Sequence, residues 1–400
     1  MNNLRSCLAF VTLSALVALG RGETQLIARL QDGIDPAEVA SSDGVILRDR
    51  TPNAPFALFA VRPTDDSASA QARLVADPRV VWAEDNVDMD APETDTQKSG
   101  KGGSMSVIGD RAALQNRNFK ALSQISFSPF LANSPGRAVR IAILDTGLSR
   151  LQTALWNKTD AFIDAVTPGG NANDTITGTD SNGNGVKDEG VGHGTMVAGI
   201  IDQVAPQVHF VIARVADSDG RASAWTLTQG LAFAVVSKAE VANISMGSSS
   251  RVAAMTDVAE WCETNGLLIV AAIGNASQNG AYYPARVSKV LCVSGLNSDN
   301  TKATFSNWDG ACSGAAPAVG IASQWWDGNI AVWSGTSFAA PFVSGAIADC
   351  LRRTGPVAPR SFLKLVNVSG TNIDKVNGAY KKMLGTLLNI VRLDGSLRHP

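Results

Sequence analysis

The sequence predicts an α/β fold with a doubly wound, mostly parallel sheet, preceded by a small α+β domain. Beyond residue 135, apolar runs alternate with helical patterns, as in strand–helix–strand units. The runs are apolar nearly throughout, which is typical of parallel strands covered by helices on both faces. Composition also changes near residue 100: residues 23–100 carry 15 acidic and 7 basic side chains, whereas residues 101–400 carry 21 and 25. The net charge of −2 therefore hides an acidic segment and a mildly basic one.

Residues 1–22 have the pattern of an export signal. Arg5 precedes an apolar run over residues 7–19, and small residues follow it. The run is too short to span a bilayer comfortably, and no other stretch approaches an uninterrupted membrane span. We therefore expect a secreted protein, extracellular or periplasmic, with no membrane partner.

The acidic segment, residues 23–90, predicts a compact α+β domain. Strand patterns cover residues 24–31, 56–63 and 80–85, and helical patterns cover residues 35–42 and a stretch capped by Thr64. Residues 91–112 are expected to be a linker and the maturation region, because residues 91–105 are polar, Gly-rich and without periodicity. The opposite charges favour a pro-segment that docks on the main domain. An ordinary, permanently retained N-terminal domain is the alternative.

Residues 113–400 form the predicted doubly wound domain. Buried-strand runs are expected at residues 139–145, 208–215, 241–246, 266–274 and 290–296. Helical patterns lie between several of them, for example at residues 224–239 and 252–266. In such a sheet, functional groups gather at the carboxyl ends of the strands.

Composition also limits the chemistry of the site. Nucleic acid is not expected as a partner, because phosphate binding requires a basic face. Only three histidines occur, at positions 193, 209 and 399, so a multi-histidine zinc centre is not expected. After the signal, an even number of cysteines is compatible with two disulfides in any of three pairings, or with buried free thiols. These cysteines are Cys262, Cys292, Cys312 and Cys350.

Three motifs carry candidate catalytic groups. ILDTG places Asp145 at the carboxyl end of the first strand, and GHGTMVAG places His193 at the start of a small-residue helix. SGTSFAAP places Ser337 at the opening of another helix, where the helix dipole stabilises developing negative charge. A serine hydroxyl needs an adjacent base, imidazole provides one, and a buried carboxylate orients the imidazole. Each residue alone could be a cap, turn or core residue, but the three together predict a Ser-His-Asp triad.

These motifs, in the order Asp, His, Ser, resemble those of the subtilisin-like (subtilase) serine proteases over roughly 250 residues. The resemblance implies that Asn275, after the strand LLIVAA, donates to the oxyanion. It further implies that the segment Ser245, Met246 and Gly247 pairs with the substrate backbone. Residues 77–86 resemble the closing strand of the family's inhibitory propeptide, which implies self-cleavage in or near residues 86–112.

The expected function is therefore that of a secreted, self-processing serine endopeptidase acting on proteins or peptides. It is expected to be a monomer that requires no cofactor. Residues 180–188 alternate oxygen-bearing side chains like a calcium loop but lack the final glutamate, so calcium is only a secondary expectation. A catalytically silent binding protein of the same fold is the main alternative. An α/β-hydrolase esterase is disfavoured, because Ser337 lacks the G-x-S-x-G context.

Overall fold

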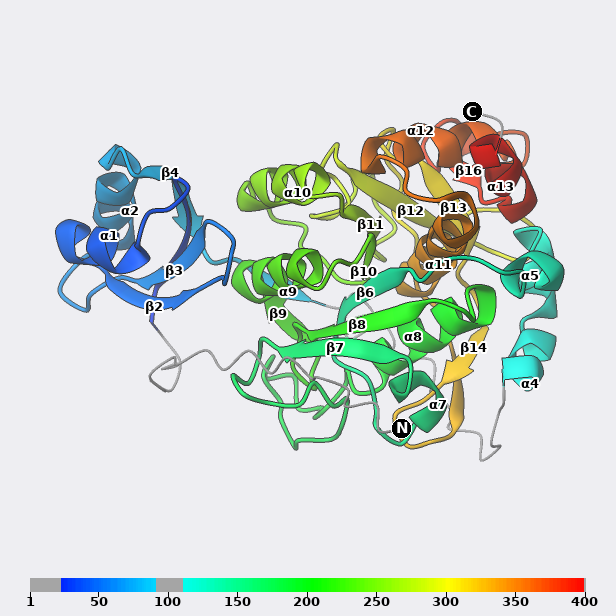
Figure 1. The fold of residues 1–400 in the computed structure, drawn as a ribbon, viewed down its shortest axis with the longest axis horizontal. Helices are drawn as coiled ribbons and strands as arrows, with labels where there is room; N and C mark the ends of the chain where they lie inside the picture. Colours follow the sequence, from blue (N-terminus) through cyan, green and yellow to red (C-terminus); the bar gives the residue numbers. More distant parts are fainter. Residues whose placement is uncertain (1–22, 91–110, 399–400) are drawn as a thin grey trace.

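The computed structural model describes residues 23–90 and 111–398, which form two packed units (Figure 1). The predicted signal, residues 1–22, and most of the predicted linker lie outside the described residues. None of the described helices is both long and apolar enough to cross a bilayer.

The N-terminal unit is a four-stranded sheet, in the order β2-β3-β1-β4, with two helices on one face. Its elements are β1 (Gln25–Leu30), α1 (Pro36–Asp43), β2 (Ile46–Arg50), β3 (Phe56–Ala60), α2 (Ser67–Ala76) and β4 (Val80–Asp85). The expected cap of the second helix was wrong. Asp66, not Thr64, is the N-cap of α2: its carboxylate accepts a hydrogen bond from the Ser69 N–H at 2.8 Å. Strand β2 was not predicted, because its sequence ILRDR is charged and does not alternate apolar with polar residues.

The C-terminal unit is built on a sheet in which every strand pair is parallel, in the order β16-β13-β12-β11-β10-β6-β8-β7. The predicted strands are confirmed as β6 (Arg140–Asp145), β8 (His209–Arg214), β10 (Val241–Ile244), β11 (Leu268–Ala272) and β12 (Val290–Leu296). Not predicted were β7 (Thr159–Asp164), β13 (Gly314–Pro317) and β16 (Thr386–Leu387).

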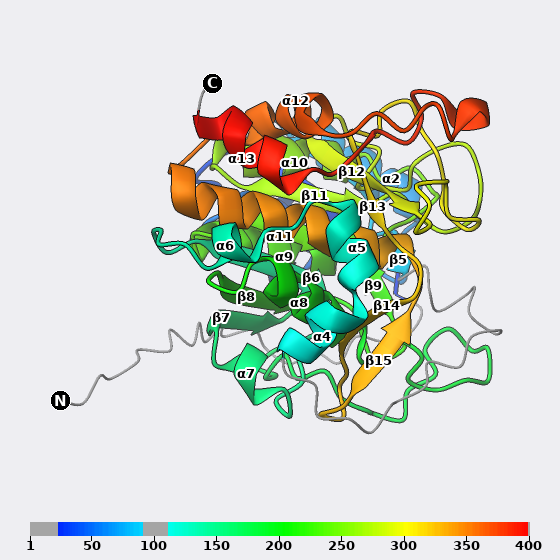
Figure 2. The same ribbon diagram turned by 90° about the vertical axis from the view of Figure 1, so that its right-hand side faces the viewer.

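Helices cover both faces of this sheet. On one face α8 (His193–Val204) packs beside the long α11 (Thr336–Thr354), as Figure 2 shows. On the other face lie α9 (Ala224–Val236) and α10 (Ala254–Thr264). This two-sided burial is why the central strands are apolar throughout.

Shorter elements complete the fold around this core. They are β5 (Asp88–Asp90), α4 (Arg111–Arg117), α5 (Phe119–Gln124), α6 (Pro129–Ala132), α7 (Thr153–Trp156), β9 (Arg221–Ser223), β14 (Ile321–Gln324), β15 (Ile330–Trp333), α12 (Pro359–Ser369), the 3₁₀ turn Gly378–Tyr380 and α13 (Ile390–Arg398). Strands β14 and β15 form an antiparallel hairpin that leads directly into α11.

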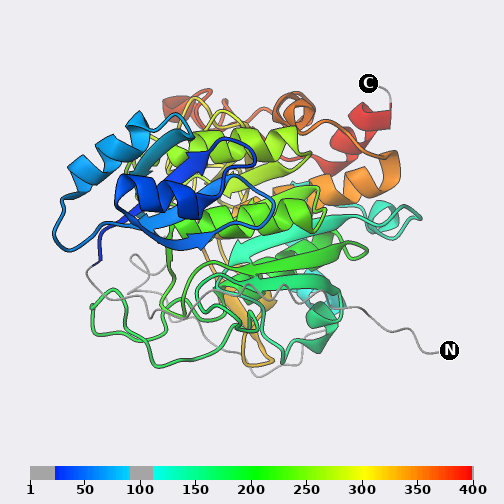
Figure 3. The ribbon, with the colours of Figure 1, turned by 60° about the vertical axis from the view of Figure 1, so that its left-hand side comes forward.

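The sheet of the N-terminal unit faces α9 and α10 of the C-terminal unit (Figure 3). Side chains alternate along β1: Leu26 packs under α1 and α2, whereas Ile27 joins the core of the C-terminal unit. On β3, Phe56 packs edge-on against Trp261 of α10, with ring centroids 5.7 Å apart. The apolar outer face of the small sheet is therefore buried by the larger unit.

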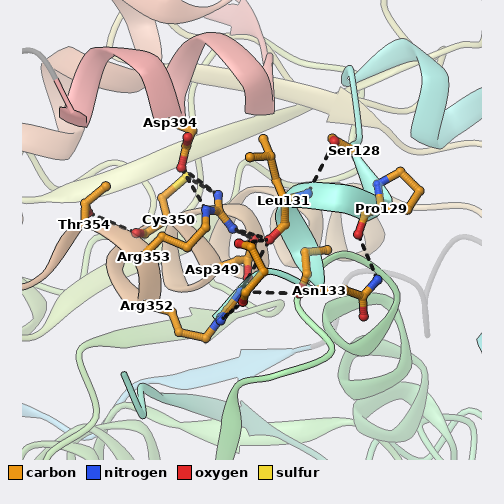
Figure 4. A network of polar contacts seen from close by, with 12 residues as sticks. Ser128, Pro129, Leu131, Asn133, Asp349, Cys350, Arg352, Arg353, Thr354 and Asp394 are labelled. Atoms are coloured by element: carbon orange, nitrogen blue, oxygen red, sulfur yellow. Dashed lines mark hydrogen bonds and ion pairs between the residues drawn. The ribbon is translucent and has the colours of Figure 1, made fainter. Parts of the chain in front are cut away.

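A buried network of ion pairs and hydrogen bonds surrounds the C-terminal end of α11 (Figure 4). Arg353 pairs with Asp349 one turn earlier and with Asp394 of α13, and its side chain is 1% exposed. Arg352 donates to backbone carbonyls near α6, including that of Ala132 at 3.3 Å. The network fastens α6 and α13 onto the helix that carries Ser337 at its other end.

All four described cysteines are buried, and this structure links none of them in a disulfide. Cys292 and Cys312 lie together, with their Sγ atoms 2.9 Å apart. Cys262 and Cys350 belong to helices on opposite faces of the sheet.

Candidate active site

Asp145 and His193 meet at the carboxyl end of the central strand β6. Asp145 is the last residue of β6, His193 is the first of α8, and both side chains are buried. Nδ1 of His193 lies 2.7 Å from Oδ1 of Asp145, which also accepts from the Thr146 N–H at 2.8 Å. A buried carboxylate in this position orients the imidazole and stabilises its protonated form. The other described histidine, His209, is half-exposed and pairs with Asp160.

Ser337 enters the same site as the second residue of α11. The ring of His193 packs against Phe338, the next residue, with centroids 5.4 Å apart. The Ser337 hydroxyl donates to the carbonyl oxygen of Ser245 at 2.9 Å. The structure thus brings His193 to the start of α11, where Ser337 lies.

Asn275 follows β11 and is held by the residue preceding Ser337. Its Oδ1 accepts from the backbone N–H of Thr336 at 2.9 Å and from the Thr336 hydroxyl at 2.8 Å. The side chain is buried, and these two bonds determine which way the amide is turned. Its nitrogen is the group that can donate to an oxyanion.

The residues of the predicted substrate segment have two different roles: Ser245 contacts Ser337, and Gly247 pairs with another backbone segment. The Ser245 hydroxyl is buried and donates to the carbonyl of Ser337 at 2.8 Å, and Met246 is buried as well. Gly247 instead pairs its backbone with Asp90, through hydrogen bonds of 3.0 and 3.1 Å. Gly247 therefore offers a backbone edge to an added strand, whereas Ser245 supports the backbone of Ser337.

The chain's own residues 88–90 occupy a position between two backbone edges. Strand β5 pairs antiparallel with β9, and Asp90 reaches Gly247 on the other side. Arg221 of β9 also pairs with Asp88, at 2.6 Å. An extended peptide can therefore lie between β9 and Gly247 as a middle strand.

Sequence reasoning missed a buried carboxylate next to the candidate base. Asp174 accepts from the N–H of Gly192 at 2.9 Å and from the N–H and hydroxyl of Thr195 at 3.2 and 2.7 Å. It therefore caps the first turn of α8, where His193 lies. Burial raises the pKa of Asp174 to about 6, and the nearby Asp145 adds to the rise. No local pattern indicates this role, because Asp174 lies in a loop 18 residues before Gly192.

The loop with calcium-like spacing uses its oxygens internally. The Asp180 carboxylate accepts from Gly183 and Gly185, and Asp219 accepts from Ser181 and Asn182. Among the described residues, no three His, Cys, Asp or Glu side chains converge as metal ligands.

Comparison with known proteins identifies the family. The model of the subtilase family matches residues 136–370, more than half of the chain. The chain belongs to the subtilase family. The matched region includes Asp145, His193 and Ser337.

Related sequences are bacterial proteases. The subtilase is 32% identical over 222 residues to Subtilisin BL of Lederbergia lenta, covering 53% of this chain and 76% of that protein. It is 33% identical to Alkaline elastase YaB of Bacillus sp. (strain YaB), covering 53% of this chain and 54% of the relative, so it spans about half of this longer relative. These relatives and the family match identify the chain as a serine endopeptidase of the subtilisin type.

Solved structures agree with the observed architecture. A cold adapted subtilisin-like serine proteinase, 25% identical, covers 68% of this chain and 97% of its own with a TM-score of 0.57. Fervidolysin from Fervidobacterium pennivorans is 20% identical and covers 94% of this chain and 61% of its own, with a TM-score of 0.72. The parallel α/β sheet with flanking helices is thus the subtilisin-like fold.

Proposed function

We propose that this subtilase is a secreted endopeptidase in which Ser337 is the nucleophile, His193 the general base and Asp145 the residue that orients His193. The proposal rests on the buried pair of Asp145 and His193, whose Oδ1 and Nδ1 atoms lie 2.7 Å apart. This pair lies beside the start of α11, the helix that carries Ser337. His193 accepts the hydroxyl proton as Ser337 attacks the scissile carbonyl, and later returns it to the leaving amine.

Asn275 and the backbone N–H of Ser337 are proposed to stabilise the oxyanion. The amide of Asn275 is already turned by Thr336, so it needs no reorganisation as charge develops. The helix dipole of α11 favours the same negative charge. This mechanism uses groups of the chain alone and is proposed to require no cofactor, with calcium as a secondary proposal for a structural ion.

Substrates are proposed to be extended protein or peptide segments. The pairing of β5 with β9 and of Asp90 with Gly247 provides the pattern that a substrate backbone would follow. No nucleic acid or membrane partner is proposed, and the expected state is a monomer.

Residues 23–90 are proposed to be an inhibitory propeptide that follows a signal at residues 1–22 and is released by self-cleavage in or near residues 86–112. Two features support docking in addition to Phe56. The Glu84 carboxylate accepts from the Ala254 N–H at the start of α10, at 2.6 Å. Asp49 accepts from Trp225 and Gln229 of α9, at 3.3 and 2.7 Å.

Replacement of the nucleophile tests the proposed function. Ser337→Ala should keep the pro-segment attached after the signal is removed, and it should not hydrolyse casein. The control is Ser344→Ala, which replaces another buried serine of the same helix and should still mature. Maturation and wild-type casein hydrolysis by Ser337→Ala would refute the assignment.

The catalytically silent alternative has its own test. A fluorophosphonate should label the wild-type protein at Ser337, because only an activated serine reacts. If the folded, processed protein remains unlabelled, it is a binding protein with a subtilase fold.

A further inference from the structure

The turn that carries Asn275 is held from two sides. Thr336 fixes the Asn275 side chain, as described above, and its hydroxyl also accepts from the Gly274 N–H at 3.2 Å. On the opposite side, residues 305–308 run alongside the turn. In this segment the carbonyl of Phe305 accepts from Ser277 at 2.8 Å.

One side chain of that segment fills the inside of the turn. Asn307 is fully buried, and its Oδ1 accepts from the N–H groups of Ala276 and Gln278, at 2.9 and 3.2 Å. Its Nδ2 donates to the carbonyls of Ile273 and Gly280, at 3.4 and 3.2 Å. All four hydrogen bonds of this amide therefore go to residues 273–280, on both sides of Asn275.

Backbone contacts confine Asn307 further. Its own N–H donates to the carbonyl of Gly274 at 3.0 Å. A Cβ atom on Gly274 would lie 2.8 Å from Asn307 Nδ2, so the two segments approach this closely only because residue 274 is glycine, here at φ 108°. Asn307 and Thr336 thus grip the turn from opposite sides.

We propose that Asn307 is a positioning residue for catalysis, which sets the backbone of residues 273–280 so that the Asn275 amide meets the oxyanion. This rests on the proposed role of Asn275. Oxyanion donors act only at the distance that the transition state requires. A displaced turn therefore lowers kcat more than it weakens substrate binding. Asn307 itself touches no reacting atom.

Replacing Asn307 should separate kcat from KM. Asn307→Ala, and the isosteric Asn307→Asp, which cannot donate to Ile273 and Gly280, should lower kcat on a peptide anilide about 10- to 100-fold. KM should change by less than about threefold, because the strand-pairing edges are untouched. Maturation of each variant is completed with a trace of wild-type enzyme, so that its own activity does not limit the measurement.

A matched control uses Asn377, another buried asparagine in this region. Its Oδ1 accepts from the Lys302 N–H at 2.7 Å, and its Nδ2 donates to Asn300 and Ile373. It does not hydrogen-bond to the turn. Asn377→Ala should lower the unfolding midpoint as Asn307→Ala does, yet keep the wild-type kcat.

A double-mutant cycle decides between positioning and general loss of structure. If Asn307 acts through Asn275, then Asn307→Ala should cost less than about threefold in kcat once Asn275 is already alanine. The full loss in that background, or a wild-type kcat in both Asn307 variants, would overturn the proposal. If Asn275→Ala alone retains wild-type kcat, the oxyanion role itself fails and the positioning role falls with it.

A separate observation concerns the cysteine pair. Cys292 lies in β12 and Cys312 precedes β13, both buried, with their Sγ atoms 2.9 Å apart. We infer that these two form a disulfide in the exported protein, and that Cys262 and Cys350 remain thiols. Two S–H bonds are replaced by one S–S bond, and the two electrons and two protons pass to a disulfide donor of the oxidising compartment.

Peptide mapping tests this pairing. Protein from the export pathway, and protein refolded in a glutathione redox buffer, is alkylated under denaturing conditions without reduction. Linked peptides containing Cys292 and Cys312, with alkylated Cys262 and Cys350, are expected in both samples. Four alkylated cysteines or another pairing in the refolded protein would overturn the inference, whereas a linkage found only there would place the failure in the proposed export.

Discussion

Two buried carboxylates, those of Asp145 and Asp174, lie near His193. Asp145 bonds the imidazole of His193, whereas Asp174 bonds the backbone of the turn from which His193 projects. The two acids therefore have different hydrogen-bond partners: the imidazole ring for Asp145 and the backbone of Gly192 for Asp174. Burial leaves Asp174 with a raised pKa of about 6.

This raised pKa predicts a pH-dependent contribution to stability. Because the folded protein binds this proton more tightly than the unfolded chain, the contribution is present below about pH 4 and is lost as pH rises through about 6. Relative to Asp174→Asn, the wild-type side chain should lose about 2 kcal/mol of unfolding free energy between pH 4 and 7. Urea denaturation in the Ser337→Ala background measures this difference, and a difference independent of pH would contradict the prediction.

At the scale of elements, α8 and α11 carry the proposed base and the proposed nucleophile and pack directly on one another. Gly345 of α11 lies at the contact between them, against Val204 and Ile201. A Cβ atom there would lie 2.6 Å from Cγ2 of Val204 and 3.4 Å from Cα of Ile201. Small residues on α11 therefore set the spacing of the two helices.

Gly345→Ala should reduce stability by about 1–3 kcal/mol, because α8 must shift to admit the methyl group. Gly395→Ala is the matched control: this helical glycine of α13 is exposed, and a Cβ atom would meet nothing within 4 Å. The control should be neutral or up to about 1 kcal/mol stabilising. Equal denaturation midpoints for the two variants would refute this view of the helix contact.

The docking of α13 depends on one buried arginine. Arg353→Met removes the buried arginine that Asp349 and Asp394 share, leaving them only Arg352 and Arg398, and should cost up to about 3–5 kcal/mol. Arg398 also pairs with Asp394, but its side chain is 48% exposed, so Arg398→Met should cost less than about 1 kcal/mol. Chemical denaturation of both variants checks this contrast, which would be absent if the network were only superficial.

At the scale of the whole molecule, the interface between the two units contains carboxylates. Burial raises the pKa of Asp49, which faces Trp225 and Gln229. Burial also raises the pKa of Glu84, which faces the start of α10 and lies near Arg251. Both groups therefore take up protons more readily when docked.

Docking should weaken as pH rises through these raised pKa values, since the docked form binds more protons than the separated form. After processing, the fraction of pro-segment that co-elutes with the fluorophosphonate-treated peptidase domain should fall between pH 4 and 7. Asp49→Asn and Glu84→Gln should flatten the dependence. Retention that increases with pH would show that other groups control release.

Much of the C-terminal unit could be predicted because its signals are local. Five apolar runs identified five central strands, and each catalytic candidate lies in a motif at a strand end or helix start. Strand β7 (TDAFID) escaped, since an edge strand with charged residues lacks a continuous apolar run. Thr64 was mistaken for a helix cap because Asp66, two residues later, is an equally good capping residue and makes the bond.

By itself the sequence determined the five central strands, the family and the three candidate catalytic groups, because periodicity and motifs are properties of neighbouring residues. Only the tertiary structure decided which residues hold those groups: Asp174 under His193, Thr336 on Asn275, and Asn307 inside the turn. Each of these contacts joins positions from 18 to 61 residues apart. The physical reason is that a buried polar group must find its partners wherever the folded chain places them.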